Sequence, residues 1–301
     1  MPPLPHIVNI TGAGTGFGAL TARALARAGH TVYAGVRDAH GADAPHVASM
    51  QDFARTHNVD LRPLEQNVVD DTSVQDSISH VIRESGRLDV LVHNAGHMVY
   101  GPTEAFTPDQ LATLYDINTL GTQRVNRAAL PHMRRAGSGL VLWISSSSVH
   151  GGTTPFLAPY FAAKAGMDAM AVSYAAELSR WGVGTTIVSP GSFSSGTNHY
   201  SSAGSPKDKD VQKEYEEGPY KGVGEEIKAR LGKLESKDAD VKEVAEAIVN
   251  VVNSPPEKRP YRLFIDPMDD GSEIVSGVRD RMRRELYWRV GFDDLLSVKQ
   301  H

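Results

Sequence analysis

Short apolar runs rich in β-branched residues recur along this chain, with stretches of helical length between them. They predict seven strands, at Ile7–Ile10, Thr31–Gly35, Leu61–Glu65, Asp89–His93, Leu140–Ser145, Gly184–Ser189 and Tyr261–Ile265. Because the segments between the first six runs are long enough for helical crossovers, we expect a doubly wound, mainly parallel α/β sheet with helices on both faces. Right-handed crossovers then place a ligand at the carboxyl ends of the strands. No internal repeat or change in composition divides the 301 residues, so we expect residues 1–301 to form a single domain.

Composition excludes several classes of function. The chain has no cysteine, which rules out disulfides, thiolate metal sites and cysteine nucleophiles. A net charge of −5 offers no basic surface to nucleic acid or anionic lipid. No apolar run is long enough to span a membrane, and the N-terminus lacks the charged start of a secretion signal. The histidines show no recognised spacing of metal ligands. We therefore expect a cytoplasmic protein without a metal site and without nucleic-acid or membrane partners.

A glycine-rich turn directly follows the first predicted strand and reads Thr-Gly-Ala-Gly-Thr-Gly-Phe-Gly over residues 11–18. Glycines at such a bend allow backbone torsions and a close approach that a Cβ would prevent. The helix that begins here offers unpaired N–H groups and a positive dipole end to a phosphate. The turn predicts a dinucleotide site in a Rossmann-type fold, formed by Gly12, Gly14, Thr15, Gly16, Phe17 and Gly18.

A second motif, Tyr160-Phe-Ala-Ala-Lys164, follows the fifth strand and a run of four serines at positions 145–148. Residues i and i+4 share a helix face, so Tyr160 and Lys164 can reach one site. Reduction of a carbonyl by hydride creates an alkoxide that must be protonated, and a tyrosine whose pKa is lowered by a neighbouring ammonium can supply that proton. The two motifs together predict an oxidoreductase that transfers hydride between a nicotinamide cofactor and a small carbonyl or secondary alcohol substrate, with Tyr160 as proton donor or acceptor.

The end of the second strand indicates which nicotinamide is used. An acidic side chain there would bind the ribose hydroxyls of NAD, but this chain has Val36 followed by Arg37. A guanidinium at this point suits the 2′-phosphate of NADP, so we expect NADP(H). NAD(H) is the alternative if Arg37 is simply a surface arginine beside Asp38.

Six motifs follow one another along the chain: the glycine loop, an Asn-Ala-Gly motif, an asparagine, the serine run, the Tyr-x-x-x-Lys pair and a Pro-Gly pair. In this order they resemble the classical short-chain dehydrogenase/reductase family, and the resemblance extends from His6 to about Ile265. The resemblance implies catalytic roles for Asn118, Ser146, Tyr160 and Lys164. It implies cofactor contacts for Asn67, Val68, Asn94, Ala95, Gly96, Tyr160, Lys164, Pro190 and Gly191. The extended branch of epimerases and dehydratases would need a glycine at position 15, where this chain has Thr15. Family members pair through helices equivalent to residues 107–137 and 159–181, which implies a homodimer or homotetramer.

Several assignments keep an alternative. Counting from the fifth strand places the catalytic serine at Ser146, whereas counting back from Tyr160 places it at Ser147. We favour Ser146 because the loop over residues 149–159 can absorb an insertion and a sheet cannot. The contact to the nicotinamide amide is open among Ser194, Ser195 and Thr197. A non-catalytic NADP(H)-binding sensor or regulatory protein is the alternative function, although such relatives typically lose the tyrosine or the lysine.

Three segments lie outside these motifs. Residues 192–236 are polar and loop-like, and are either a solvated excursion or a lid over the substrate, since they follow a sheet strand on the ligand side. The spacing of apolar residues predicts a packed helix over Asp240–Asn253. Residues 266–301 form an arginine-rich C-terminal extension that we expect to pack on the body or on a second subunit. His97 and His150 are interpreted as surface or structural histidines, with a place beside the substrate pocket as the alternative.

Overall fold

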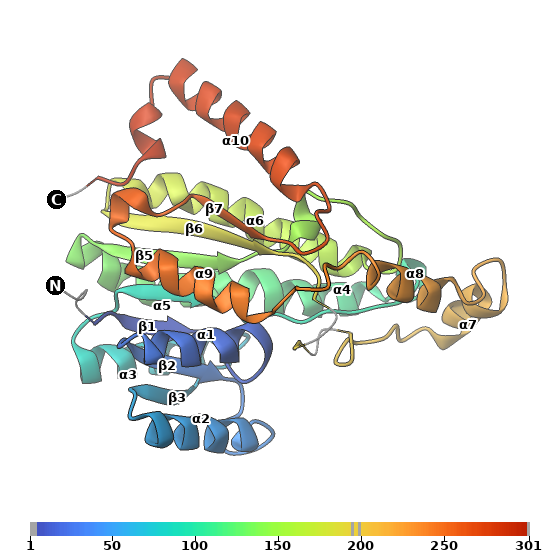
Figure 1. Ribbon diagram of the computed structural model, residues 1–301, viewed down its shortest axis with the longest axis horizontal. Helices are drawn as coiled ribbons and strands as arrows, with labels where there is room; N and C mark the ends of the chain where they lie inside the picture. The colour runs from blue at the N-terminus through green and yellow to red at the C-terminus, as the bar shows by residue number, and fades with distance from the viewer. Residues whose placement is uncertain (1–4, 194–195, 198–199, 300–301) are drawn as a thin grey trace.

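The computed structural model describes residues 5–193, 196–197 and 200–299. The strands of its sheet are β1 (Ile7–Ile10), β2 (Thr31–Val36), β3 (Leu61–Glu65), β4 (Val90–His93), β5 (Gly139–Ile144), β6 (Val183–Pro190) and β7 (Arg262–Ile265). They lie in the order β3-β2-β1-β4-β5-β6-β7, and each neighbouring pair is parallel (Figure 1). The predicted fold class is confirmed, and every predicted strand boundary lies within one residue of the observed one.

The helices are α1 (Gly16–Arg27), α2 (Ala44–His57), α3 (Asp71–Ser85), α4 (Pro108–Tyr115), α5 (Gly121–Ala136), α6 (Ala158–Ser179), α7 (Lys209–Glu217), α8 (Val223–Leu231), α9 (Lys242–Asn253) and α10 (Ser272–Arg289). Helices α1, α2 and α9 cover one face of the sheet, and α3, α5 and α6 cover the other (Figure 1). Alternate residues of β5 divide between the two cores, since Leu142 packs in the first and Trp143 in the second. Burial on both faces explains why the strands are nearly continuous apolar runs.

The segment expected to be loop-like contains two helices. Helices α7 and α8 lie between residues 192 and 236, so the loop prediction is wrong there. Both helices are amphipathic but short, and polar residues dominate the segment, which hid their periodicity in the sequence. The segment is attached to the loop before α4, since Gly204 bridges to Val99 and the Tyr100 hydroxyl donates to the carbonyl of Gly224 at 2.7 Å.

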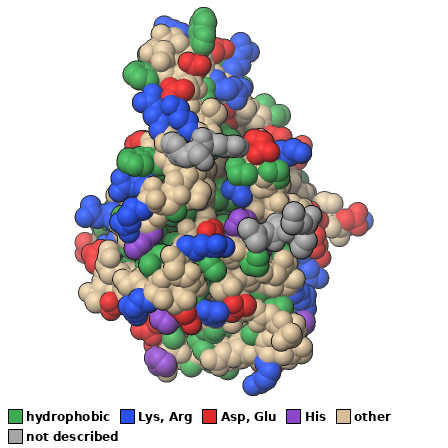
Figure 2. Space-filling model, turned by 90° about the vertical axis from the view of Figure 1, so that its left-hand side faces the viewer, with side chains coloured by type: hydrophobic (Ala, Val, Ile, Leu, Met, Phe, Trp, Pro, Cys, Tyr) green, Lys and Arg blue, Asp and Glu red, His purple; other side chains and the backbone are tan. Residues whose placement is uncertain are grey.

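The C-terminal extension is helical and stands partly clear of the body. Helix α10 leaves the sheet after β7 and projects away from it (Figure 1). In Figure 2 this projection is at the top, and basic, acidic and hydrophobic side chains share its surface. Ile274 and Trp288 are 73% and 74% exposed. Beyond α10, the carboxylate of Asp294 pairs with Arg180 at the end of α6, so the tail returns to the body. Within the described residues, no helix is long and apolar enough to cross a membrane.

Candidate active site

A cavity of about 750 Å³ opens at the carboxyl ends of the central strands. Its wall contains almost all the residues predicted for the site: Gly12, Gly14, Thr15, Gly16, Phe17, Arg37, Asn67, Val68, Asn94, Ala95, Gly96, Ser146, Tyr160, Lys164, Pro190 and Gly191. Two predicted residues, Gly18 and Asn118, lie behind this wall. The fold therefore brings the phosphate loop and the proton-transfer motif to one cavity, as expected where parallel strands end.

The glycine loop is held against the end of β4. The side-chain amide of Asn94 donates to the carbonyls of Thr11 (3.0 Å) and Gly12 (2.8 Å). In return, the Thr11 hydroxyl accepts bonds from the N–H groups of Asn94 and Ala95, each at 3.0 Å. The Asn-Ala-Gly motif thus fixes the shape of the loop before any ligand is bound.

Two glycines explain why side chains are excluded from this loop. Gly12 has φ +63°, and a Cβ there would lie 2.7 Å from the Cα of Ala95. A Cβ on Gly18 would collide with the Asn94 amide and with the Gly12 carbonyl. The side chain of Thr15 makes no capping bond to α1, which leaves the positive end of this helix directed at the cavity. This cradle fits a pyrophosphate.

The turn after β2 carries Arg37 at the surface and on the cavity wall. Asp43, a residue outside the sequence motifs, holds the backbone of this turn. Its carboxylate accepts bonds from the N–H groups of Arg37 and Asp38, each at 3.1 Å. Asp43 also lines the cavity, so a cationic and an anionic side chain share the end where the adenosine ribose is expected.

Tyr160 and Lys164 lie one turn apart on α6, and both face the cavity. The Nζ of Lys164 donates to the carbonyl of Ile144, at the end of β5, at 2.9 Å. Burial lowers the pKa of Lys164 to about 8. Burial also raises the pKa of Tyr160 to about 12, and only its hydrogen bond with Ser146 acts in the opposite direction. The pKa of Tyr160 thus lies above its ordinary value of 10 in this structure, opposite to the lowering that the motif leads us to expect, and the cause is burial of the phenol.

Both candidate serines reach the cavity wall. The Ser146 hydroxyl lies 2.7 Å from that of Ser148. Ser147 begins the short 3₁₀ turn η3 (Ser147–Val149) and is 5% exposed. Of the two candidate serines, Ser146 is the one whose side chain lowers the pKa of Tyr160.

Asn118 lies in a π-helical turn, η2 (Asp116–Leu120), and is completely buried. Its amide donates to the carbonyls of His97 (3.0 Å) and Leu114 (2.9 Å), and its oxygen accepts from the N–H of His97 at 3.3 Å. These bonds hold the backbone that follows the Asn-Ala-Gly motif, directly behind Gly96.

The remaining cofactor-side residues stand at the ends of β3 and β6. Asn67 and Val68 follow β3, and Pro190 and Gly191 end β6, where Gly191 N–H donates to the Ile265 carbonyl at 2.8 Å. Thr197 lies on the wall and its hydroxyl donates to the carbonyl of Phe193 at 3.3 Å. Ser194 and Ser195, the other two candidates for the amide contact, lie outside the described residues.

An apolar part of the wall lies beyond the catalytic motif. It is formed by Leu157, Phe161, Tyr200, Leu231 and Met268. These residues come from four separate segments, so no sequence motif could have grouped them. His97 is also on this wall, whereas His150 points away from it to α10. Among the described residues, no group of three or more His, Asp or Glu side chains is arranged to hold a metal ion.

Comparison with known proteins agrees with this geometry. The family model described as short chain dehydrogenase matches residues 6–205, about two-thirds of the chain. This protein belongs to the short-chain dehydrogenase family. Membership of this family agrees with the Rossmann-like fold and with the resemblance seen in its motifs.

Curated relatives of this short-chain dehydrogenase are similar over somewhat less than two-thirds of the chain. The 3-ketodihydrosphingosine reductase of Bacteroides thetaiotaomicron is 31% identical over 64% of the chain, and mouse 17-beta-hydroxysteroid dehydrogenase type 1 is 36% identical over 62%. The matches span 65% and 54% of the length of these two relatives, which is less than two-thirds of either.

Solved structures extend the likeness to nearly the whole chain. A short-chain dehydrogenase from Streptomyces avermitilis is 27% identical with a TM-score of 0.72, and the match covers 95% of this chain and 98% of that one. An alcohol dehydrogenase from Thermococcus sibiricus, complexed with 5-hydroxy-NADP, has a TM-score of 0.68 at 22% identity, covering 87% of this chain and 96% of that one. At this identity the second match supports the fold alone.

Proposed function

We propose that this protein is an NADP(H)-dependent carbonyl reductase or alcohol dehydrogenase that uses Tyr160 as its proton donor or acceptor. One observation carries the proposal: Ser146, Tyr160 and Lys164 meet on the wall of the same cavity that contains the glycine loop. Bound nicotinamide would supply or accept the hydride, held by the glycine loop and by the residues that end β3, β4 and β6.

The residues of the chain account for the proton. With a pKa of about 12, Tyr160 is a neutral phenol near pH 7 and can donate its hydroxyl proton to the oxygen of a carbonyl that receives hydride at carbon. The Ser146 hydroxyl lies beside it and can donate to the same oxygen as negative charge develops. Lys164, with its pKa near 8, can return a proton toward the phenolate from the closed side of the cavity. In the reverse direction, Tyr160 first passes its hydroxyl proton toward Lys164 and then, as the phenolate, accepts the proton of the alcohol while hydride leaves the carbinol carbon for the nicotinamide.

We infer a substrate with a substantial apolar part. The wall beyond Tyr160 is built from the apolar side chains described above, and residues 192–236, proposed as the lid, contribute Tyr200 and Leu231 to it. The names of the two curated relatives, a ketodihydrosphingosine reductase and a hydroxysteroid dehydrogenase, describe oxidoreductases of ketone or hydroxyl groups.

We also propose a homodimer or homotetramer. Exposed apolar side chains on the helices named for pairing support it: Leu111, Tyr115, Leu120 and Trp181 are 39–48% exposed. Light scattering in solution tests this assembly.

The test of the function is the oxidation of NADPH and NADH by the purified protein with a panel of carbonyl compounds, in parallel with Tyr160→Phe. Loss of the phenol should lower kcat by about 10²–10⁴-fold, because general acid catalysis contributes that much. Binding of NADPH, followed by its fluorescence, should stay within about threefold, since the glycine loop is untouched. Tight NADPH binding by the wild type without turnover of any carbonyl would contradict the enzyme and favour a sensor.

A further inference from the structure

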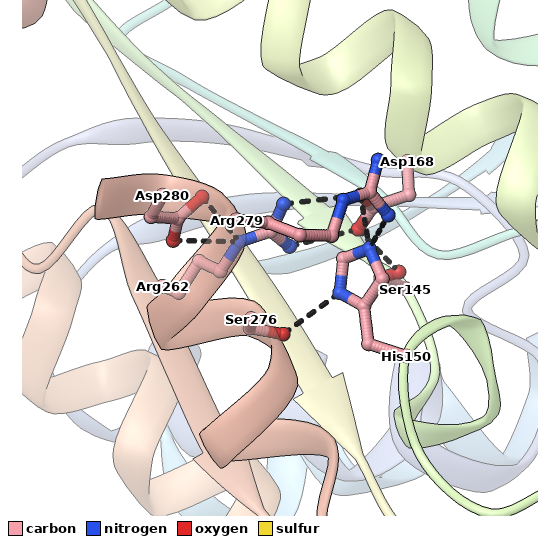
Figure 3. Close-up of polar contacts among 7 residues, drawn as sticks. All are labelled: Ser145, His150, Asp168, Arg262, Ser276, Arg279 and Asp280. Carbon is pink, nitrogen blue, oxygen red and sulfur yellow. Dashed lines mark hydrogen bonds and ion pairs between the residues drawn. The ribbon is translucent and has the colours of Figure 1, made fainter. Parts of the chain in front are cut away.

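A cluster of charged and polar side chains, centred on the buried pair of Asp168 and Arg262, lies next to the serine run, and of its members only Ser145 reaches the cavity wall. It joins residues from the loop after β5 and from α6, β7 and α10, shown in Figure 3: Ser145, His150, Asp168, Arg262, Ser276, Arg279 and Asp280. The Arg262 side chain donates to both carboxylate oxygens of Asp168, at 2.9 and 3.1 Å, and its Nε donates to Asp280 at 3.1 Å. The side chains of Arg262 and Asp168 are 5% and 3% exposed. A buried, forked ion pair of this kind fixes the orientation of both partners.

Asp168 connects this cluster to the proton-transfer motif. It lies on α6 four residues after Lys164, so Tyr160, Lys164 and Asp168 occupy successive turns of one helix face. The Ser145 hydroxyl donates to the carboxylate of Asp168 at 2.9 Å, within the buried interior. Ser145 is the residue immediately before Ser146, and its N–H donates to the Val188 carbonyl at 2.7 Å. Ser145 is therefore held by both its backbone and its side chain.

We call residues 145–152 the serine loop. Its later residues are also held by the C-terminal extension. His150 Nδ1 lies 2.7 Å from the Ser276 hydroxyl on α10, and His150 Nε2 contacts Arg279. The Gly152 N–H donates to the carbonyl of Asp270, just before α10, at 3.0 Å. The serine loop is thus connected to the C-terminal extension at both ends. Its start is connected through Asp168 and Arg262, and its end contacts the extension directly.

We propose that Asp168 is a positioning residue for the reaction, and that β7 and α10, through Arg262, Asp280 and Ser276, hold the serine loop so that the Ser146 hydroxyl faces the oxygen that reacts. This inference rests on the proposed function. It assigns the first half of α10 to the support of the active site, although neither α10 nor Asp168 touches the cavity. A purely structural ion pair would contribute to folding stability but not to the chemical step.

The test compares full-length variants that break the connection but leave the buried pair of Asp168 and Arg262 in place. Ser145→Ala removes the bond to Asp168, and Ser145→Thr restores a hydroxyl at the same place. A double variant, Ser276→Ala with Asp280→Asn, weakens the contacts from α10. We expect Ser145→Ala and the double variant to lower kcat about tenfold or more, with KM and NADPH affinity within about twofold, because small displacements of a reacting group are costly. Ser145→Thr should recover most of the activity.

Hydrogen–deuterium exchange over residues 140–155 gives a readout that does not require turnover. Exchange in the serine loop should increase in Ser145→Ala and in the double variant. The control is Asp294→Asn, which breaks another ion pair between α6 and the C-terminal extension, at the exposed Arg180, and should change neither kcat nor exchange in the loop. Unchanged exchange in the first two variants overturns the support of the loop, whether or not the protein is active. Increased exchange with unchanged kcat overturns the role of this support in catalysis. A wild type that binds NADPH but reduces no carbonyl overturns the proposed function itself.

Discussion

At the scale of single residues, the surroundings of a side chain change what its motif predicts. The Tyr-x-x-x-Lys spacing predicts that Lys164 assists Tyr160 by charge. In the structure both side chains are desolvated, and the pKa values of Tyr160 and Lys164 move toward their neutral forms, to about 12 and about 8. The surroundings of Arg37 also include a residue outside the motifs, since the Asp43 carboxylate accepts a bond from the Arg37 N–H and lines the same end of the cavity.

Replacement of Arg37 tests the cofactor preference. Arg37→Gln should weaken NADPH binding by about 10- to 100-fold and leave NADH binding nearly unchanged, since a hydrogen bond to a charged group contributes about 1.5–3 kcal/mol. Titration of each cofactor by fluorescence measures both affinities. Arg55→Gln, on the exposed side of α2, is the matched control and should alter neither. If Arg37→Gln weakens both cofactors equally, or the wild type prefers NADH, the assignment of NADP(H) is wrong.

At the scale of elements, irregular backbone provides the shape of the site. The chain leaves α4 through the π-helical turn η2 before α5 begins, and π-helical turns of this kind occur frequently at functional sites. Asn118 in this turn satisfies three backbone groups of the neighbouring segments, so it couples η2 to the Asn-Ala-Gly motif. The sequence identified the residue, but its contacts depend on two loops that meet only in the fold.

Removal of the Asn118 side chain tests this coupling. Asn118→Ala should lower the free energy of unfolding by about 1–3 kcal/mol, because buried polar groups lose their partners. Urea denaturation measures the change. Asn250→Ala, at an exposed position of α9, should stay within about 0.5 kcal/mol of the wild type. Equal stability of the two variants would show that water replaces the bonds of Asn118.

At the scale of the whole molecule, the buried polar groups make stability depend on pH. His93 ends β4, is 1% exposed, packs against Trp143 and places Nε2 2.8 Å from the Asn126 side-chain oxygen. Burial lowers the pKa of His93 to about 4 from an ordinary value of 6.5. Above pH 6.5 the ring is neutral in both the folded and the unfolded chain. As the pH falls from 6.5 to 4, only the unfolded chain takes up the proton, so folding is penalised.

The expected loss from this one group is about 3 kcal/mol by pH 4, since each unit of pKa difference corresponds to about 1.4 kcal/mol. His93→Gln removes the titrating group and keeps a hydrogen-bonding amide. The stability of the wild type relative to this variant should therefore fall by about 3 kcal/mol between pH 7 and pH 4, as measured by urea unfolding at each pH. A constant difference between the two proteins across that range would contradict the buried neutral state of His93.

The sequence alone was sufficient for the sheet, because strands buried on both faces must be nearly continuous apolar runs and the crossovers between them must be long. The glycine loop and the Tyr160–Lys164 pair, which the sequence predicts for the site, line one cavity in the fold, and their prediction needs only short-range spacing along one turn or one helix face. The sequence did not predict helices α7 and α8, whose polar surroundings obscure their periodicity.

Only the tertiary structure decided how these residues are supported and tuned. The effect of Ser146 on Tyr160 and the bond from the Asp43 carboxylate to the Arg37 backbone depend on how irregular turns fold, and the pairing of Asp168 with Arg262 joins residues 94 positions apart. The pKa of Tyr160 depends on burial, which is a property of everything that surrounds the ring. Local spacing can place a functional group on an element, but its partners and its desolvation are set by contacts that exist only after the chain has folded.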